Sequence, residues 1–573
     1  MAYALLGVLA VLTVVAVAWL APRIGVAAPV VLVLVGLGSS FIPGAPDLDL
    51  GPDLILMGVL PPILYAAALN VPITDFRRNF KAISGLSVLL VIASSVAVGL
   101  LLHWLLPDLG LAAAIALGAV VSPPDAVAAT SIGKRLGLPS RLVTVLEGEG
   151  LVNDATALVL LRSAVAATAG TVTLVEVAGD FVFAVVAAVG IGLAIGFATV
   201  WVRARIDSPV LNTAISFVVP FLAFIPAEEV HASGVLAVVV AGLVTGHQSS
   251  RHFTPADRIA ERTNWRTIQL LLENGVFLLM GFQFSSLVED AEGGASRLRV
   301  LTAVSIGLLI TLLLIVVRVL FVVPLVAVLR REQQRAEERT PRLESALDRL
   351  GSRETSEGGE SPGRLRAERF LRRQHADATF LAQEGLGWRG GGVLAWSGMR
   401  GVVTLAAAQS LPAGLPYRSQ LVLIAFTVAL VTLVGLGGTL PLVIARLGVA
   451  GTDAASERRE LATLVEEILT VGEDAVANPE LRRPDGRPYD HEALDDLRRL
   501  SRAIRVALTT PPEADHSERH PQRRELRRVF LEATHDALLD ARETGRYSSR
   551  VLERAQAVLD AEATRFDDPA DHG

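Results

Sequence analysis

Long apolar runs alternate with short polar stretches from residue 3 to residue 446 of this 573-residue chain. The runs are about as long as a helix needs to cross a bilayer, roughly 17–25 residues. The first run lacks a basic leader, so we interpret it as a span and not as a cleaved signal peptide. The pattern predicts an all-α membrane protein with about thirteen transmembrane helices, near residues 3–20, 24–42, 53–69, 83–106, 111–130, 141–168, 178–202, 209–226, 230–246, 267–285, 300–329, 391–411 and 418–446.

Two polar regions lie outside these spans. We predict a transmembrane domain at 1–330 and 391–447, a cytoplasmic insert at 331–390 and a cytoplasmic helical tail at 448–573. In the insert, 354–363 is typical of a flexible linker between short helical pieces. In the tail, apolar residues recur at helical spacing over 526–539 and 551–561. The tail is either a solvated helical bundle that aids folding or dimer contact, or a regulatory module that senses pH or a ligand.

Basic residues are distributed unevenly between the predicted loops. The odd-numbered loops before the insert contain Arg23, Arg77, Arg78, Lys81, Lys134, Arg135, Arg141, Arg203, Arg205, Arg251, Arg258, Arg262 and Arg266. The even-numbered loops contain only Arg297, Arg299 and Arg418. Because cytoplasmic loops are enriched in Arg and Lys, we expect the N-terminus outside, and the insert and tail inside, a bacterial inner membrane.

Two spans are interrupted in a way that predicts internal symmetry. Span 5 contains Ser-Pro-Pro-Asp at 122–125, where the prolines remove helix donors, and span 12 contains Trp-Ser-Gly-Met-Arg-Gly at 396–401. Interrupted spans at corresponding positions of two halves indicate an inverted-repeat transporter. The spacing fits two inverted six-helix repeats, spans 1–6 and 8–13. The alternative is that the prolines merely kink a helix.

Composition argues against several kinds of site. The chain has no cysteine, so neither disulfides nor a thiolate metal site is available. Neither His-Glu-x-x-His nor Gly-x-Ser-x-Gly occurs, which disfavours a membrane-embedded enzyme. The net charge of −6 adds little, because the charges lie mostly in loops, insert and tail.

Three carboxylates and an amide are concentrated at 147–154, inside an otherwise apolar span. Ionisable groups at membrane depth are costly, so such a cluster indicates a functional site. At about 100° per residue, Asp154 lies nearly on the same face as Glu147, whereas Glu149 and Asn153 share another face. The spacing predicts one polar stripe facing an ion path and one facing a buried partner.

A carboxylate in a low-dielectric site can hold a proton or a cation, but hardly both at once. This competition is the physical basis of exchange. A hard cation prefers oxygen ligands, which Asp154, Asn153 and the backbone freed around Pro124 could supply. Asp125 either belongs to this set or balances the dipoles of two helix ends. The alternative is a buried polar network with only a structural role.

Arg400 is a cation at the middle of a late span, where an unpaired charge would be costly. It therefore requires a carboxylate partner. We predict a scaffold ion pair between Glu149 and Arg400, with Glu147 as the competing partner.

Other polar residues define a possible ion pathway that includes Glu147 and Tyr65. Glu273 could line this path or pair with Arg318, and the sequence leaves both open. Glu228, at the external end of two spans, fits a solvated turn as well as an entry funnel. Arg162 could pair locally or extend its charged end to the interface.

Together these motifs resemble those of the monovalent cation:proton antiporter-1 family of sodium/proton exchangers. The resemblance rests on four segments in order, Ser-Pro-Pro-Asp-Ala-Val-Ala at 122–128, Glu-Gly-Glu-Gly-Leu-Val-Asn-Asp at 147–154, Glu-Glu-Val-His-Ala-Ser-Gly-Val-Leu-Ala at 228–237 and Gly-Met-Arg-Gly at 398–401. Each alone is weak, but their combination is specific. They cover the membrane part and not the insert or tail.

The resemblance implies thirteen spans, two inverted repeats and a homodimer whose core domain moves against a dimerisation domain. Asp154 corresponds to the carboxylate that binds ion and proton, and Asn153 to its neighbouring amide. Glu149 and Arg400 resemble the structural ion pair of the family. An Asn-Asp pair, in place of Asp-Asp, is similar to the electroneutral one-for-one exchangers.

Three residues depart from the family pattern. Gly150 stands where many members have a serine, Pro124 where many have threonine, and Tyr65 where many have an acidic residue. Fewer side-chain oxygens are then available, so the preference among sodium, lithium and potassium could differ.

We therefore expect a secondary antiporter that exchanges cytoplasmic sodium for external protons and serves pH homeostasis. Its expected partners are monovalent cations, membrane lipid and a second copy of the chain. We expect no enzymatic activity, no cofactor and no nucleic-acid partner. The alternatives are a potassium-preferring antiporter and, less favoured, a cation channel.

Overall fold

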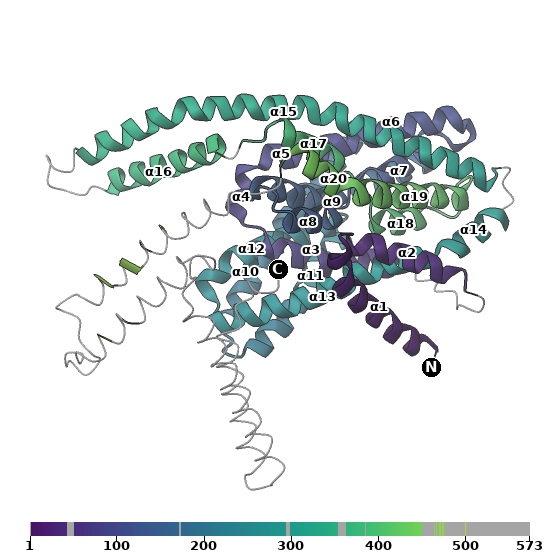
Figure 1. Ribbon diagram of the computed structural model, residues 1–573, viewed down its shortest axis with the longest axis horizontal. Helices are drawn as coiled ribbons and strands as arrows, with labels where there is room; N and C mark the ends of the chain where they lie inside the picture. Colours follow the sequence, from purple (N-terminus) through teal and green to yellow (C-terminus); the bar gives the residue numbers. More distant parts are fainter. Residues whose placement is uncertain are drawn as a thin grey trace, which may run out of the picture. The chain divides into compact units, whose positions relative to one another are not determined.

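The computed structural model describes residues 2–42, 51–170, 174–293, 298–352, 362–383 and 385–449, with a few separate positions in the tail. All regular structure in these ranges is helical (Figure 1). The chain divides into two units, Met1–Thr452 and Asp453–Gly573. The tail helices predicted at 526–539 and 551–561 lie outside the described residues.

The first unit begins with helices α1 (Ala2–Ile24), α2 (Ala28–Ser40), α3 (Leu60–Asn70), α4 (Ile73–Arg78), α5 (Phe80–Ser84), α6 (Leu90–Leu105), α7 (Leu111–Val121), α8 (Ala126–Arg135) and α9 (Ser140–Ala169). It continues with α10 (Leu174–Arg203), α11 (Pro209–Glu229), α12 (Gly234–His252), α13 (Pro255–Phe282) and α14 (Phe284–Gly293). The remaining helices are α15 (Val300–Ser352), α16 (Pro362–Gln383), α17 (Trp388–Trp396), α18 (Val402–Gln409), α19 (Arg418–Thr432) and α20 (Gly438–Leu447). Short irregular helices are η1 (Leu54–Val59), η2 (Gly85–Leu89), η3 (Pro107–Leu109) and η4 (Leu433–Gly437).

Nine helical segments within the described ranges are long and apolar enough to cross a membrane, and three more apolar helices are shorter. Every span expected from the hydropathy pattern overlaps a helix or a run of consecutive helices. The all-α prediction is therefore confirmed in the described part of the chain. The number thirteen and the two inverted repeats stay predictions.

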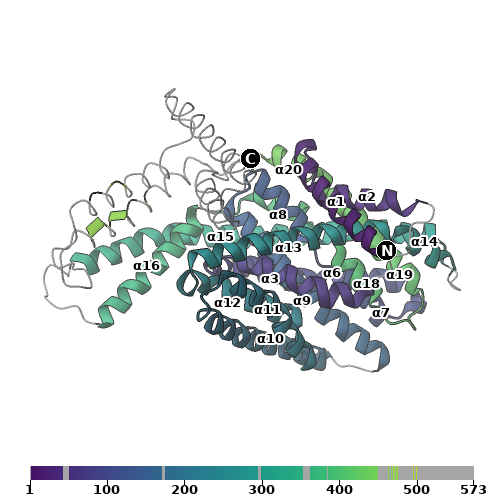
Figure 2. The same cartoon turned by 90° about the horizontal axis from the view of Figure 1, so that it is seen from below.

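The buried apolar side chains form two clusters. The first contains residues of α1, α2, α6, α7, α15 and α17–α20, and the second contains residues of α3, α10, α11 and α12. Helices α9 and α13 contribute to both clusters. In Figure 2, α9, α3 and α13 accordingly lie between α10–α12 and the helices around α18 and α19. The polar residues of α9 are thus at the boundary between two packed bundles.

Among the described residues, η1, η2 and η4 are π-helical turns, and η1 lies just before α3. There η1 runs into Pro61 and Pro62, which lack the N–H groups that would continue regular α-helical hydrogen bonding. Widened turns of this kind often occur at functional sites. Here the widened turn places Ile55 and Val59 on the wall of the cavity described below.

The insert consists mainly of two helices, not of short pieces. α15 is 53 residues long and continues past the predicted span, and α16 folds back along it (Figure 1). Asp377 of α16 accepts hydrogen bonds from Arg77 (3.1 Å) and Arg78 (2.7 Å) of α4. The insert is therefore fixed to the membrane bundle. The linker expected at 354–363 lies almost wholly outside the described residues.

Candidate ion-exchange site

The two predicted interruptions lie against each other. One separates α7 from α8 and the other separates α17 from α18. The backbone N–H of Asp125 donates to the carbonyl of Met399 across them, with an N···O distance of 2.6 Å. A Cβ on Gly401 would overlap the carboxylate of Asp125, so only glycine lets the two segments approach this closely. The prolines and glycines that predicted the breaks also permit their contact.

The helix ends at this crossing are matched by residues of opposite charge. Asp125 is the N-cap of α8, and its carboxylate accepts from the N–H of Val127 at 2.8 Å. The Arg400 guanidinium donates to the carbonyl of Val121, the last residue of α7, at 3.1 Å. It also donates to the carbonyl of Gly398, just after α17. Anions stabilise helix N-termini and cations stabilise C-termini, so both charges stabilise the interruptions.

α9 presents its polar residues on two faces, as its spacing predicts. Glu147 and Asp154 line one cavity, together with Gly150. Glu149 and Asn153 do not line it and are 2% and 0% exposed. α9 therefore has one face toward a cavity and one toward packed protein.

Asn153 links α9 to the interruption between α7 and α8. Its amide donates to the carbonyl of Pro124 at 2.6 Å, and its side-chain oxygen accepts from the N–H of Asp154 at 2.7 Å. The Pro124 carbonyl lies in the break between α7 and α8, outside the hydrogen bonding of either helix, and a buried carbonyl needs a partner. Asn153 thus connects the backbone of Asp154 to the break.

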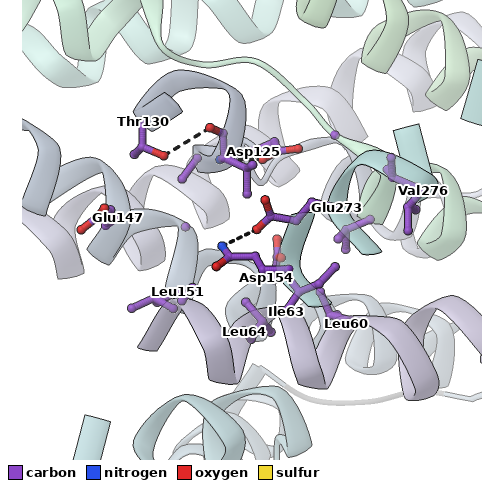
Figure 3. A pocket seen from close by; sticks show the side chains of 18 of the residues that line it. Leu60, Ile63, Leu64, Asp125, Thr130, Glu147, Leu151, Asp154, Glu273 and Val276 are labelled. Carbon is purple, nitrogen blue, oxygen red and sulfur yellow. Dashed lines mark hydrogen bonds between the residues drawn. The ribbon is translucent and has the colours of Figure 1, made fainter. Parts of the chain in front are cut away.

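The cavity beside α9 has a volume of about 570 Å³ and is lined by η1, α3, α8, α9, α13 and α18. Four carboxylates line it, those of Asp125, Glu147, Asp154 and Glu273 (Figure 3). Much of the remaining wall is apolar. At its exposed end the cavity is lined by basic side chains, Lys134, Arg262 and Arg266. A hydrated cation has room to enter and would meet oxygen ligands at the inner end.

Asp154 also borders a second void, of only about 10 Å³. Apolar side chains line this void, including Leu158 and Leu161 of α9 and Val403 of α18. Its volume is at the lower limit for one water molecule. Asp154 therefore faces open space on one side and close apolar packing on the other.

An ion pair lies farther along α9, two helical turns after Asp154. Arg162 contacts the carboxylate of Glu228 on α11. Glu228 also accepts from the backbone N–H of Gly234 at 2.9 Å. This pair connects α9 to a helix of the second apolar cluster.

The predicted pairing of Glu149 with Arg400 is wrong. Both carboxylate oxygens of Glu149 accept from the guanidinium of Arg318 on α15, at N···O distances of 2.7 and 2.9 Å. The two side chains are each 2% exposed. Arg318 also donates to the carbonyl of Leu394 on α17, at 2.9 Å. The buried ion pair thus joins α9, α15 and α17.

The difference follows from the backbone around each arginine. Arg400 lies in a helix break, where free carbonyls satisfy its donors without a carboxylate. Arg318 lies within the continuous α15, whose carbonyls are used by the helix itself, so it needs an acidic partner. Glu147, the competing partner considered for Arg400, instead pairs with Lys134 of α8 at 2.6 Å.

The structure also locates three residues that were predicted to belong to the ion pathway. Glu273 lines the cavity and accepts from Gln269 at 2.6 Å, so its alternative pairing with Arg318 is wrong. Tyr65 is fully buried in the second cluster, with its ring 5.2 Å from that of Trp265. Glu228 is ion-paired and is neither a free turn residue nor a lining residue of the cavity.

Comparison with known proteins identifies the family. The profile of the sodium/hydrogen exchanger transmembrane family matches residues 9–446. The chain belongs to this family. An uncharacterized Na(+)/H(+) exchanger of Mycobacterium tuberculosis (strain H37Rv) is 28% identical over 568 residues, covering 96% of this chain and 93% of that protein.

Two further relatives differ in how much they share with this exchanger. A sodium, potassium, lithium and rubidium/H(+) antiporter of Bacillus pumilus is 31% identical over 308 residues, 51% of this chain and 45% of its own length. The structure of the sodium proton antiporter MjNhaP1 from Methanocaldococcus jannaschii matches with a TM-score of 0.53 at 16% identity. That match covers 77% of this chain and 97% of MjNhaP1 and shows a shared fold. The exchanger is thus a multi-pass membrane transporter of the cation/proton class.

A polar stripe along α13 of the exchanger lines the cavity. Of its residues, only Glu273 was predicted from the sequence to line the ion path. Arg262, Arg266, Gln269 and Glu273 all line the cavity. Their spacing of four, three and four residues places them on one face of a helix. That regular spacing is the signal present in the sequence, but the hydropathy pattern places the two arginines in a cytoplasmic loop.

A second buried ion pair in the exchanger is also absent from the predicted site. Arg203, expected in a loop, has a fully buried side chain and donates to Glu261 of α13 at 2.8 Å. It also donates to Asn212 of α11 and lies over the ring of Phe253. In the sequence, an arginine at the end of a predicted span looks the same whether its side chain is buried or solvated.

Proposed function

We propose that the exchanger transports sodium against protons by alternating access, with Asp154 binding the two in turn. The observation that supports this is the position of Asp154 at the inner end of the cavity, with sealed apolar packing on its other side. Burial away from bulk water favours a neutral state of the site, which either a bound proton or a bound monovalent cation provides. Asp125, the backbone at Pro124 and Asn153 would complete or position this site.

Replacement of the proposed carboxylate is the direct test. Asp154→Asn should abolish proton-coupled sodium uptake into inside-out vesicles while the protein still folds. The amide keeps the size of the side chain but cannot exchange a proton for a cation. Wild-type exchange in this variant would refute the assignment.

The ion preference and the stoichiometry belong to the same proposal. The Asn153–Asp154 pair resembles that of the electroneutral one-for-one exchangers, and the family name supports sodium. The alternative is a potassium-preferring antiporter; the Bacillus pumilus relative is a sodium, potassium, lithium and rubidium/H(+) antiporter, so potassium is a second candidate ion. Dequenching of a pH dye in reconstituted vesicles, with each chloride salt and with or without an imposed potential, separates these possibilities. A flux that follows voltage without proton coupling would instead indicate a channel.

We further infer the orientation of the site. The excess of basic residues in odd-numbered loops supports a cytoplasmic position for the exposed end of the cavity. The described conformation is then inward-facing, and the Arg162–Glu228 pair closes the external side. Thirteen spans with the N-terminus outside, two inverted repeats and a homodimer in a bacterial inner membrane complete this proposal. The insert and tail would be cytoplasmic, and the exchange would serve pH homeostasis.

A further inference from the structure

We propose that Glu273 is a second cation-binding carboxylate, which holds the ion together with Asp154 only in the inward-facing state. The inference rests on the proposed function and adds a residue from a helix outside the two interrupted segments. It predicts a cation site that is stronger on the cytoplasmic side than on the external side.

The geometry places Glu273 in the same cavity as Asp154 but on the opposite wall. Glu273 and Gln269 lie one turn apart on α13, and the Gln269 amide donates to one carboxylate oxygen at 2.6 Å. Figure 3 shows both carboxylates, Glu273 and Asp154, in the space between α9 and α13. Gln269 fixes the direction of Glu273, while its second oxygen has no protein partner among the described residues. That oxygen is available to a ligand.

Three side chains close to Asp154 in the chain or in space do not supply a further oxygen ligand. A side chain on Gly150 would overlap the Cβ of Ala126, the first residue of α8, so a hydroxyl does not fit there. Tyr65 is buried against Trp265 and does not line the cavity. The side-chain oxygen of Asn153 is used by the N–H of Asp154. A hard cation with few oxygen ligands therefore needs one from another helix.

The other carboxylates of the cavity have roles in holding helices together. Glu147 forms an ion pair with Lys134 toward the exposed end. One oxygen of Asp125 caps α8. Glu273 forms no ion pair among the described residues; its hydrogen-bond partner is the neutral Gln269 amide, and Lys134 acts on it only at longer range. Its free oxygen is therefore open to a cation entering from the exposed end.

The helices of the two walls, α9 and α13, contribute to both apolar clusters but pack mainly on different neighbours, and we call these two sets of neighbours the packing groups. A motion of one group against the other would make the contribution of Glu273 depend on conformation. α9 packs on α7, α8 and η2, whereas α13 packs on α2, α11 and α3. Alternating access requires one group to move against the other. Asp154 then moves with its cation, and Glu273 stays behind. The second carboxylate thus assists binding and release on one side of the membrane.

The experiment measures sodium transport by one variant from the cytoplasmic face and from the external face of the membrane. Glu273→Gln should raise the half-saturating sodium concentration in inside-out vesicles by about tenfold, which corresponds to about 1.4 kcal/mol. In right-side-out vesicles the change should remain below about twofold, since Glu273 does not face the external site. Glu273→Asp keeps the charge and should give an intermediate shift in inside-out vesicles.

A matched control removes a carboxylate of the same type from the next helix along the chain. Glu289→Gln alters an exposed residue of α14 outside the cavity and should leave both half-saturating concentrations unchanged. Equal shifts on both faces, or no shift on either, would overturn the inference. If Glu273→Gln fails to fold, the comparison of inside-out with right-side-out vesicles is made with Glu273→Asp alone. Failure of the proposed function itself gives a different result, because Asp154→Asn would then retain exchange.

Discussion

At the scale of single residues, glycine determines how closely the interrupted segments pack. Gly401 lies against the carboxylate of Asp125, and Gly150 lies against Ala126. In both places a Cβ would occupy space already filled by a neighbouring helix. The glycine at 150, which departs from the family pattern, therefore has a steric explanation in this chain.

Adding a single methyl group at Gly401 should disturb the site strongly. Gly401→Ala forces the Asp125 carboxylate or the break itself to move, because their contact leaves no room for a methyl group. We expect a lower melting temperature and at least a tenfold loss of exchange, since misplacing reacting groups by about 1 Å can cost about that much or more. Gly179→Ala is the control, because a Cβ on that residue of α10 meets no atom within 4 Å. Equal behaviour of the two variants would contradict the packing argument.

At the scale of helices, the buried Glu149–Arg318 pair connects α9 to α15. Removing one partner leaves an uncompensated buried charge, which typically costs about 3–5 kcal/mol. Glu149→Gln and Arg318→Gln should therefore each lower the melting temperature strongly. The double variant should be less destabilised than the sum of the two, because neither charge is then left alone. Additive losses in melting temperature would show that the two residues act independently.

The sequence predicted local features of these helices better than their partners. The breaks at 122–125 and 396–401 follow from proline and glycine within each segment, and the two faces of α9 follow from helical periodicity. The predicted partner of Glu149 is Arg400, whereas the observed partner is Arg318, 169 residues away. That choice depends on which helices pack together and which carbonyls a break leaves free. Neither property is encoded near Glu149, so only the three-dimensional arrangement decides it.

At the scale of the whole exchanger, alternating access requires contacts between the two packing groups to break and reform. Arg162 on α9 and Glu228 on α11 form such a contact on the side of Asp154 that is sealed. Partly exposed ion pairs contribute little to stability, so this one can open at small cost. Its position, more than its strength, makes it a candidate external gate.

Holding this gate shut should stop exchange without unfolding the protein. The chain contains no cysteine, so Arg162→Cys and Glu228→Cys introduce the only two thiols. A reversible bifunctional thiol reagent that spans the ion pair should abolish exchange, and a reductant should restore it. The same experiment at Lys81 and Glu332 is the control, because that ion pair joins α5 to α15, whose buried residues Ala82 and Val326 belong to one cluster. Full exchange with the 162–228 link in place would mean that α9 and α11 do not separate during transport, and the external gate would have to lie elsewhere.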